Sequence, residues 1–106
     1  MSPEERYDHL VEQVAATGRI WLLEDEAGLV GSVDEEGQRY LAIWPDLESA
    51  DACAIGPWKE ARPTSMDVRA ALHAIIEREG MLAAHPTPED EGFLVSAADF
   101  ELRLVD

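Results

Sequence analysis

Three short apolar runs follow one another between residues 20 and 44, and acidic turns that contain glycine separate them. The runs are Ile20–Leu23, Leu29–Val33 and Tyr40–Trp44. Short apolar runs bounded by turn residues are typical of β-strands, and their close spacing predicts an antiparallel meander. The first run is apolar at every position, as expected of a strand covered on both faces, so we expect it to be central in the sheet.

A helix is predicted before the first of these strands. Ser2 and Glu5 have the spacing of a capping box, Pro3 suits the first helical position, and Gly18 suits the end of the helix. The apolar stripe consists of Tyr7, Leu10, Val11 and Val14. Because these residues are three and four positions apart, they share one face of a helix.

The second half of the chain alternates helical and extended patterns. Asp46 is placed to cap a short helix, and Ser65 to cap a longer one, with Gly80 after its end. The longer helix has the apolar stripe Val68, Ala71, Leu72, Ile75 and Ile76. The remaining predicted elements are an extended edge segment at Trp58–Arg62, strands at Met81–Ala84 and Phe93–Val95, and a last helix capped by Ser96. This order predicts an α+β fold, a single domain over residues 1–106, with a mostly antiparallel sheet of about five strands and helices packed on it.

The charge balance is strongly acidic, because 23 Asp and Glu residues oppose 8 Lys and Arg residues and give a net charge of −15 at pH 7. Binding to nucleic acid needs a clustered cationic face, which this sequence lacks, so we expect no nucleic-acid partner. An anionic membrane surface would repel the chain, and no apolar run approaches the roughly 20 residues of a membrane-spanning helix, so we expect no membrane partner. The charge is explained by solubility alone, or it steers association with a basic protein partner.

Two features of the sequence indicate a cytoplasmic protein. Cys53 is the single cysteine, so the chain forms no intramolecular disulfide and does not depend on an oxidising compartment. Residues Met1–Glu5 are acidic and lack the basic-then-apolar order of a secretory signal.

Candidate catalytic and metal-binding side chains are few. Cys53 falls on the apolar side of its predicted helix, with no neighbouring cation to lower its pKa, so we expect a structural role. His9, His73 and His85 lie in separate segments without the spacing of a zinc site, and each is expected to be a surface or packing residue. The acidic turns lack the order of a calcium-binding loop, and the glycines form no phosphate-binding loop. We therefore predict no catalytic residue, no metal ligand and no cofactor.

Two tryptophans at element boundaries remain as candidate recognition residues, with the two acidic hairpin tips beside them. A large amphipathic ring at such a boundary either covers the edge of a core or forms a recognition surface. The candidate binding residues are Trp44, Trp58, Asp25, Glu26, Glu35 and Glu36. Together they predict a face suited to a partner that is basic and partly apolar.

The chain also resembles a known bacterial family along nearly its whole length. The residues that carry the resemblance are Trp21–Gly28, Tyr40–Asp46, Ala50, Trp58, Pro86 and the acidic Glu89–Gly92. They are similar to the family catalogued as domain of unknown function 2750, in which a Trp-bearing strand, an acidic Gly turn and a strand ending in Trp-Pro follow a short helix. Ala42 stands where that family commonly has proline. The resemblance implies no activity, and the layout is also distantly similar to the N-terminal domain of SseB-type proteins, which are linked to interaction roles.

These observations favour a non-enzymatic protein-interaction or regulatory module. One alternative is an immunity-type inhibitor of a basic toxin, and another is a small enzyme or ligand-binding domain that uses carboxylates with His73 or His85. A third is that the acidity only adapts the protein to a salty cytoplasm. Edge pairing through the Trp58 segment could also form a homodimer.

Overall fold

A computed structural model describes residues 2–78 and 80–104, with the side chains of residues 75–78 left out. The strands are β1 (Arg19–Asp25), β2 (Gly28–Leu29), β3 (Gly31–Val33), β4 (Arg39–Ile43), β5 (Arg62–Asp67), β6 (Met81–Ala84) and β7 (Phe93–Ser96). The helices are α1 (Pro3–Thr17), α2 (Leu47–Ala52), α3 (Val68–Arg78) and α4 (Ala97–Leu104), with a single 3-10 turn, η1 (Gly56–Trp58).

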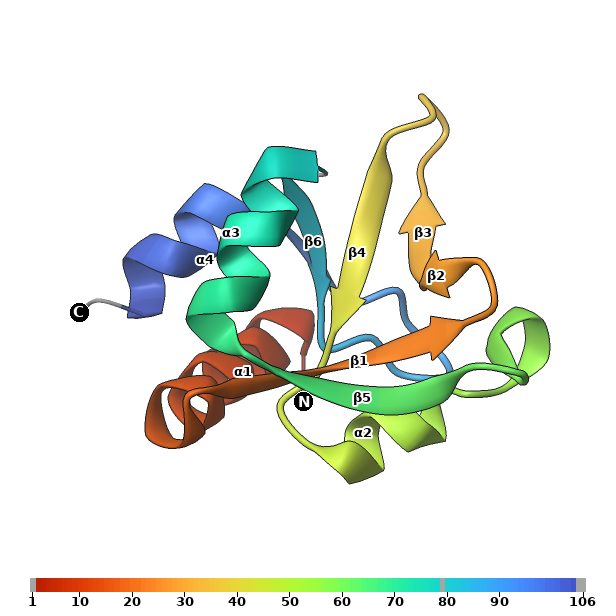
Figure 1. Cartoon of the computed structure of the whole chain (residues 1–106), viewed down its shortest axis with the longest axis horizontal. Coiled ribbons are helices and arrows are strands. Elements are labelled where there is room, and N and C mark those ends of the chain that lie inside the picture. Colours follow the sequence, from red (N-terminus) through yellow and green to blue (C-terminus); the bar gives the residue numbers. More distant parts are fainter. Residues whose placement is uncertain (1, 79, 105–106) are drawn as a thin grey trace.

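The strands form two sheets, in the orders β2-β1-β5 and β3-β4-β6-β7 (Figure 1). Among the described strands every pairing is antiparallel except β4 with β6, which are parallel and joined by the crossover through α2, β5 and α3. The predicted α+β class is therefore confirmed. The predicted count of about five strands is too low, because the described residues form seven.

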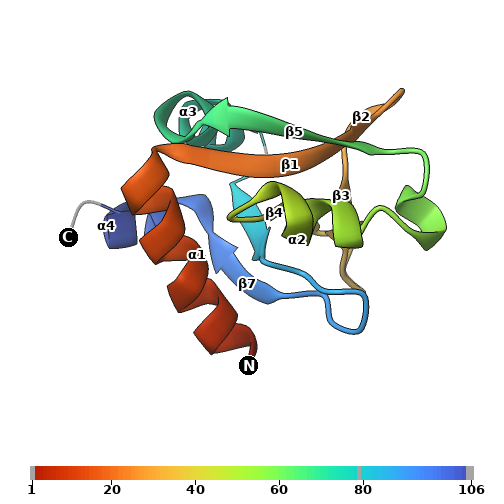
Figure 2. The same ribbon diagram turned by 90° about the horizontal axis from the view of Figure 1, so that it is seen from below.

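Strands β1 and β4 supply alternate residues to two apolar cores, because both faces of each strand are covered. Ile20, Leu22, Leu41 and Ile43 belong to the larger core, to which α1, α3 and α4 also contribute. The residues that alternate with them, Leu23, Ala42 and Trp44, belong to a smaller core beside α2, and Trp21 packs against it. Figure 2 shows α2 alongside β1 and β5, away from α1. Successive side chains of a strand point to opposite faces, so an unbroken apolar run fits this position, and β1 is central in its sheet as predicted.

The predicted meander is interrupted at Val30, where the chain passes from one sheet to the other. The Val30 amide donates to the carbonyl of Leu23 at 2.9 Å, and the Val30 carbonyl accepts from the amide of Ala42 at 3.3 Å. The run predicted as one strand therefore divides into β2, which pairs with β1, and β3, which pairs with β4. An antiparallel bridge between Trp21 and Trp44 joins the two sheets a second time.

Strand β5 was not predicted from the sequence. Its position changes two predicted features, the edge segment at Trp58–Arg62 and the cap of the helix that follows. Of the predicted edge segment Trp58–Arg62, Trp58 ends η1, a turn follows, and only Arg62 is extended, as the first residue of β5, which pairs along its whole length with β1. Ser65, predicted to cap α3, lies within β5, and Asp67 caps the helix instead by accepting from the Ala70 amide at 3.1 Å. Met66 is the one large apolar residue of β5, so no alternating pattern marks the strand.

The free edge of β5 is poorly suited to the homodimer expected from edge pairing. The backbone N–H and C=O of Trp21 both form hydrogen bonds with Trp44. Trp21 and its partner on β5, Ser65, are therefore a non-hydrogen-bonded pair. By the same alternation the nitrogen of Pro63, opposite Leu23, points to the free edge, where proline has no hydrogen to donate. A second copy pairing along β5 would lack that bond. The homodimer stays a prediction, and this edge does not favour it.

The first and last helices begin as predicted. The Ser2 hydroxyl accepts from the Glu5 amide at 3.2 Å and the Glu5 carboxylate accepts from the Ser2 amide at 3.0 Å, which completes the capping box of α1. Ser96 likewise accepts from the Asp99 amide at 3.0 Å and caps α4. The stripe residues Tyr7, Leu10, Val11, Val14, Ala71 and Leu72 are all buried. The side chains of Ile75 and Ile76 lie outside the described residues.

Ser2→Ala should lower the free energy of unfolding by about 1 kcal/mol, because it removes the acceptor for an amide that the helix itself leaves unpaired. Urea denaturation followed by circular dichroism measures the change. Ser2→Asp is the matched control, since aspartate is also a strong capping residue and should preserve the stability. Equal stability of Ser2→Ala and the parent protein would contradict a role for the cap.

Candidate functional site

Trp58 forms one wall of a groove between η1 and the loop of residues 85–92, which joins β6 to β7. A hollow of about 450 Å³ is lined by Gly31, Cys53, Ile55, Gly56, Pro57, Trp58, Thr87 and Pro88. A second hollow of about 280 Å³ is lined by Ser32, Trp58, Pro86, Thr87, Pro88, Glu89, Asp90 and Glu91. Trp58, Thr87 and Pro88 belong to both, and we call the two hollows together the Trp58 groove.

The Trp58 groove is apolar at one end and acidic at the other. At the apolar end, Ile55 exposes 52% of its surface beside Pro57 and the half-buried ring of Trp58. At the other end lies the third acidic turn of the chain, Glu89–Glu91. A ligand along this groove would meet an apolar surface and a set of carboxylates in succession.

Trp44 supports this groove from inside and cannot contact a partner. Its side chain is 0% exposed, because the bridge with Trp21 places it in the smaller core between the two sheets. The ring packs edge-on against that of Trp58, with centroids 6.1 Å apart and planes at 86°. Its indole N–H donates to the Pro86 carbonyl at 2.9 Å. The prediction that Trp44 lies on the binding face is therefore wrong, and its role is to hold Trp58 and the loop in place.

Cys53 has the structural role expected from the sequence. Its thiol donates to the Pro86 carbonyl at 3.2 Å, from a side chain that is nearly fully buried. Burial raises the pKa of the Cys53 thiol, and the negative charge of Glu89 acts in the same direction. The thiol is therefore held neutral and poorly nucleophilic.

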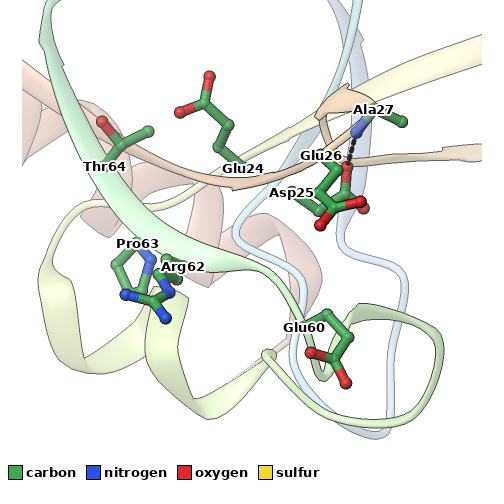
Figure 3. Close-up of a pocket in the computed structure, with 8 residues that line it drawn as sticks. All are labelled: Glu24, Asp25, Glu26, Ala27, Glu60, Arg62, Pro63 and Thr64. Atoms are coloured by element: carbon green, nitrogen blue, oxygen red, sulfur yellow. Dashed lines mark hydrogen bonds between the residues drawn. The ribbon is translucent and has the colours of Figure 1, made fainter.

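The first acidic tip lines a separate and larger hollow of about 880 Å³ (Figure 3). It lies between the β1–β2 turn and the start of β5, and its lining residues are Glu24, Asp25, Glu26, Ala27, Glu60, Arg62, Pro63 and Thr64. The Asp25 carboxylate accepts from the Ala27 amide at 2.9 Å and so shapes the turn. Four carboxylates and one guanidinium line this hollow, which makes this surface strongly negative.

The second acidic tip lines neither the Trp58 groove nor the larger hollow. Glu35 and Glu36 are exposed at the β3–β4 turn, where the Asp34 carboxylate accepts from the amides of Glu36 and Gln38, each at 2.9 Å. Figure 1 shows this turn extending away from the β1–β2 turn. The six predicted binding residues are therefore not brought together. Of these six residues Trp58 alone lines the groove, and the carboxylates that flank it are those of Glu89–Glu91.

The buried side chain of Arg6, in α1, also holds the loop of residues 85–92. Arg6 of α1 is only 8% exposed, its Nε donates to the His85 carbonyl at 3.2 Å, and its Nη2 lies 3.3 Å from an Asp90 carboxylate oxygen. His85 is itself buried and has a φ of 54°, in the left-handed region. Burial lowers the pKa of the His85 imidazole, and the charges of Arg6 and His9 act in the same direction, whereas a hydrogen bond to the His85 backbone and the charge of Asp46 oppose them. Sequence reasoning missed the Arg6–His85 contact because 79 positions separate the two residues.

The described residues offer neither a metal-binding cluster nor a membrane-spanning helix. No group of three or more His, Cys, Asp or Glu side chains in this part of the chain could hold a metal ion. None of the described helices is long and apolar enough to cross a membrane.

Comparison with known families gives one match. A family model described as "Protein of unknown function (DUF2750)" matches residues 7–104. The chain belongs to the DUF2750 family. The resemblance predicted from the sequence is thereby confirmed. No curated protein and no solved structure matches the chain, so the likeness to SseB-type proteins stays a prediction.

The DUF2750 match covers almost all of the site. Trp58, the loop of residues 85–92 and both hairpin tips fall within it, whereas Arg6 lies just before it. Membership of the DUF2750 family brings no activity with it, and the features that bear on function are the groove and the loop themselves.

Proposed function

We propose that this DUF2750 protein is a protein-interaction module whose Trp58 groove binds a basic segment of a partner protein. The observation that supports this most directly is the change, within one groove, from the apolar wall at Ile55 and Trp58 to the carboxylates of Glu89–Glu91. A partner segment with an apolar side chain next to lysine or arginine would complement both ends.

Trp58 is suited to be the anchor of such a contact because its ring is fixed before binding. The ring packs edge-on against the fully buried Trp44 and follows Pro57 in η1. A side chain that is already ordered loses little conformational entropy when a partner binds. Tryptophan is also among the residues that contribute most to binding energy at protein interfaces.

The charge of the whole molecule favours a basic partner. The net charge is −15, and the hollow at Glu24–Glu26 adds a second negative surface on the same small molecule. A negative electrostatic field accelerates the encounter with a cationic segment of a partner and repels acidic segments. Because mobile ions screen exposed charges beyond about 10 Å at 0.1 M salt, such a complex should weaken as salt is added.

Trp58→Ala should reduce the affinity for a basic, partly apolar peptide by at least about tenfold, since it removes the apolar anchor. The probe is a fluorescently labelled peptide of alternating lysine and leucine, and the measurement is fluorescence anisotropy at low and at high salt. A peptide of alternating glutamate and leucine is the control and should not bind. Binding of both peptides with equal affinity, or an unchanged affinity in Trp58→Ala, would contradict the proposal.

The two pairs of acidic residues offer a matched test of where the partner lies. Glu89→Gln with Glu91→Gln removes two charges at the groove and should weaken binding about two- to tenfold, whereas Glu35→Gln with Glu36→Gln removes two charges at the β3–β4 tip, which does not line the groove. The second pair should leave the affinity nearly unchanged. If both pairs reduce the affinity equally, overall charge attracts the peptide and the groove is not its site.

A further inference from the structure

Opposing contacts hold the loop that closes the Trp58 groove. On the inner side the Pro86 carbonyl accepts from the Trp44 indole at 2.9 Å and from the Cys53 thiol at 3.2 Å. On the α1 side Arg6 contacts the His85 carbonyl at 3.2 Å and the Asp90 carboxylate at 3.3 Å. These contacts keep the loop residues between them, Thr87 and Pro88, in the wall of the groove.

His85 stands at the start of this loop in an unusual state. Its φ of 54° lies in a region that side-chain-bearing residues rarely adopt, and the imidazole is buried, with 9% exposure. Among the other described residues, no group accepts from or donates to its buried Nδ1, and the hydrogen bond of the ring is with the backbone of His85 itself. Backbone strain and an unsatisfied buried polar atom in one residue are both costly, and both concentrate at functional positions.

Charged and titratable groups face His85 from three elements. From α1 come Arg6 and His9, whose ring centroid lies 6.3 Å from that of His85. Asp46, the cap of α2, and Asp90, in the loop itself, supply negative charge, and Asp90 is already paired with Arg6. Burial has the largest influence and lowers the pKa of His85 below its ordinary value of 6.5, so the imidazole is neutral at neutral pH.

We propose that protonation of His85 is a pH switch that releases the loop of residues 85–92 and opens the Trp58 groove. A second positive charge beside Arg6 in a buried space must reach water, and leaving the left-handed conformation is the movement that exposes it. The adjacent Pro86 then moves away from Trp44 and Cys53, and the groove loses a wall. This inference rests on the proposed function of the groove, but the movement of the loop itself needs no partner.

The direction of the pH effect follows because the closed loop favours the neutral form of the His85 imidazole. Because the fold holds the His85 pKa below that of the unfolded chain, the closed loop is fully stabilised above about pH 6.5. The stabilisation is lost progressively as the pH falls below that value. At neutral pH the loop is therefore in place and the groove can bind its partner. On acidification the loop is released and the groove loses this wall.

The indole N–H resonance of Trp44 reports on the loop directly, because this group donates to the Pro86 carbonyl. In the whole protein without any peptide, its proton shift should move upfield as the pH is lowered from about 6.5 and the hydrogen bond is lost. His85→Asn tolerates the left-handed conformation and does not titrate, so its indole resonance should stay constant as the pH is lowered. His85→Gly is a second variant with the same expectation. His73→Asn, which changes an exposed histidine of α3, is the control and should titrate like the parent.

Two results overturn the switch. One is a Trp44 resonance that stays constant in the parent protein, and the other is one that titrates equally in His85→Asn or His85→Gly. Anisotropy with the lysine-leucine peptide, measured in parallel, separates the switch from the groove function. A resonance that titrates while the peptide binds at no pH supports the switch and contradicts the proposed binding. Peptide binding with a constant resonance overturns the switch alone.

Discussion

Trp44→Ala should lower the free energy of unfolding by about 3–5 kcal/mol, the range for removing a fully buried aromatic side chain. The substitution leaves a cavity in the smaller core between the two sheets, and the Pro86 carbonyl loses its indole donor. A small domain is stable by only about 5–15 kcal/mol, so the variant should be strongly destabilised. Urea denaturation followed by circular dichroism measures the loss, since this signal does not depend on the deleted tryptophan.

One further variant separates the roles of the Trp44 ring and its N–H, and another compares Trp44 with Trp58. Trp44→Phe keeps most of the apolar volume but loses the donor, and because Cys53 still donates to Pro86 it should cost about 1–2 kcal/mol. Trp58→Ala removes a half-buried ring and should cost less than Trp44→Ala while weakening peptide binding more. A Trp58→Ala variant that is the less stable of the two would contradict the assignment of Trp44 to the core and Trp58 to the surface.

The helices could be predicted from the sequence because their ends are determined locally. The capping box at Ser2, the Asp46 cap of α2 and the Ser96 cap of α4 each involve residues within three positions of one another. The helical period then predicts which side chains are buried, as it does for Leu10 and Val14. Such patterns do not depend on what the rest of the chain does.

Strand pairing was harder to predict because it depends on distant partners. β5 has little apolar patterning, and it becomes a strand because β1 offers a complementary edge, whose residues lie 38 to 48 positions from their partners in β5. Trp44 precedes a proline, a position that is equally compatible with a surface or a core. The bridge to Trp21 decides between them, and no local pattern indicates that bridge.

The arrangement of the candidate site also depends on contacts between residues that are distant in the sequence. The acidic turns and the two tryptophans are visible in the sequence, but their arrangement is not. Glu89–Glu91 flanks Trp58 because the loop of residues 85–92 packs against η1, whereas the tip with Glu35 and Glu36 projects elsewhere. Arg6 and His85 have no shared local pattern, although together they position that loop.

Gly31→Ala should destabilise the protein by about 3 kcal/mol, at the upper end of the cost of overpacking. A Cβ at this position would lie 2.3 Å from the backbone oxygen of Tyr40 and 3.2 Å from its carbonyl carbon. Both atoms belong to β4, which pairs with β3 at this point, so no side-chain rotation can relieve the clash. Urea denaturation measures the loss.

Gly37→Ala is the matched control for this prediction. A Cβ at Gly37 would meet nothing within 4 Å, so the cost there is only that of its φ of +86°, about 1–2 kcal/mol. Gly31 also lines the Trp58 groove, directly after the residue at which the chain crosses between the sheets. Separation of β3 from β4 should therefore weaken binding of the lysine-leucine peptide as well as the fold, whereas Gly37→Ala should leave binding unchanged. A Gly31→Ala variant as stable as Gly37→Ala would contradict the close approach of β3 and β4, and with it the shape of the groove.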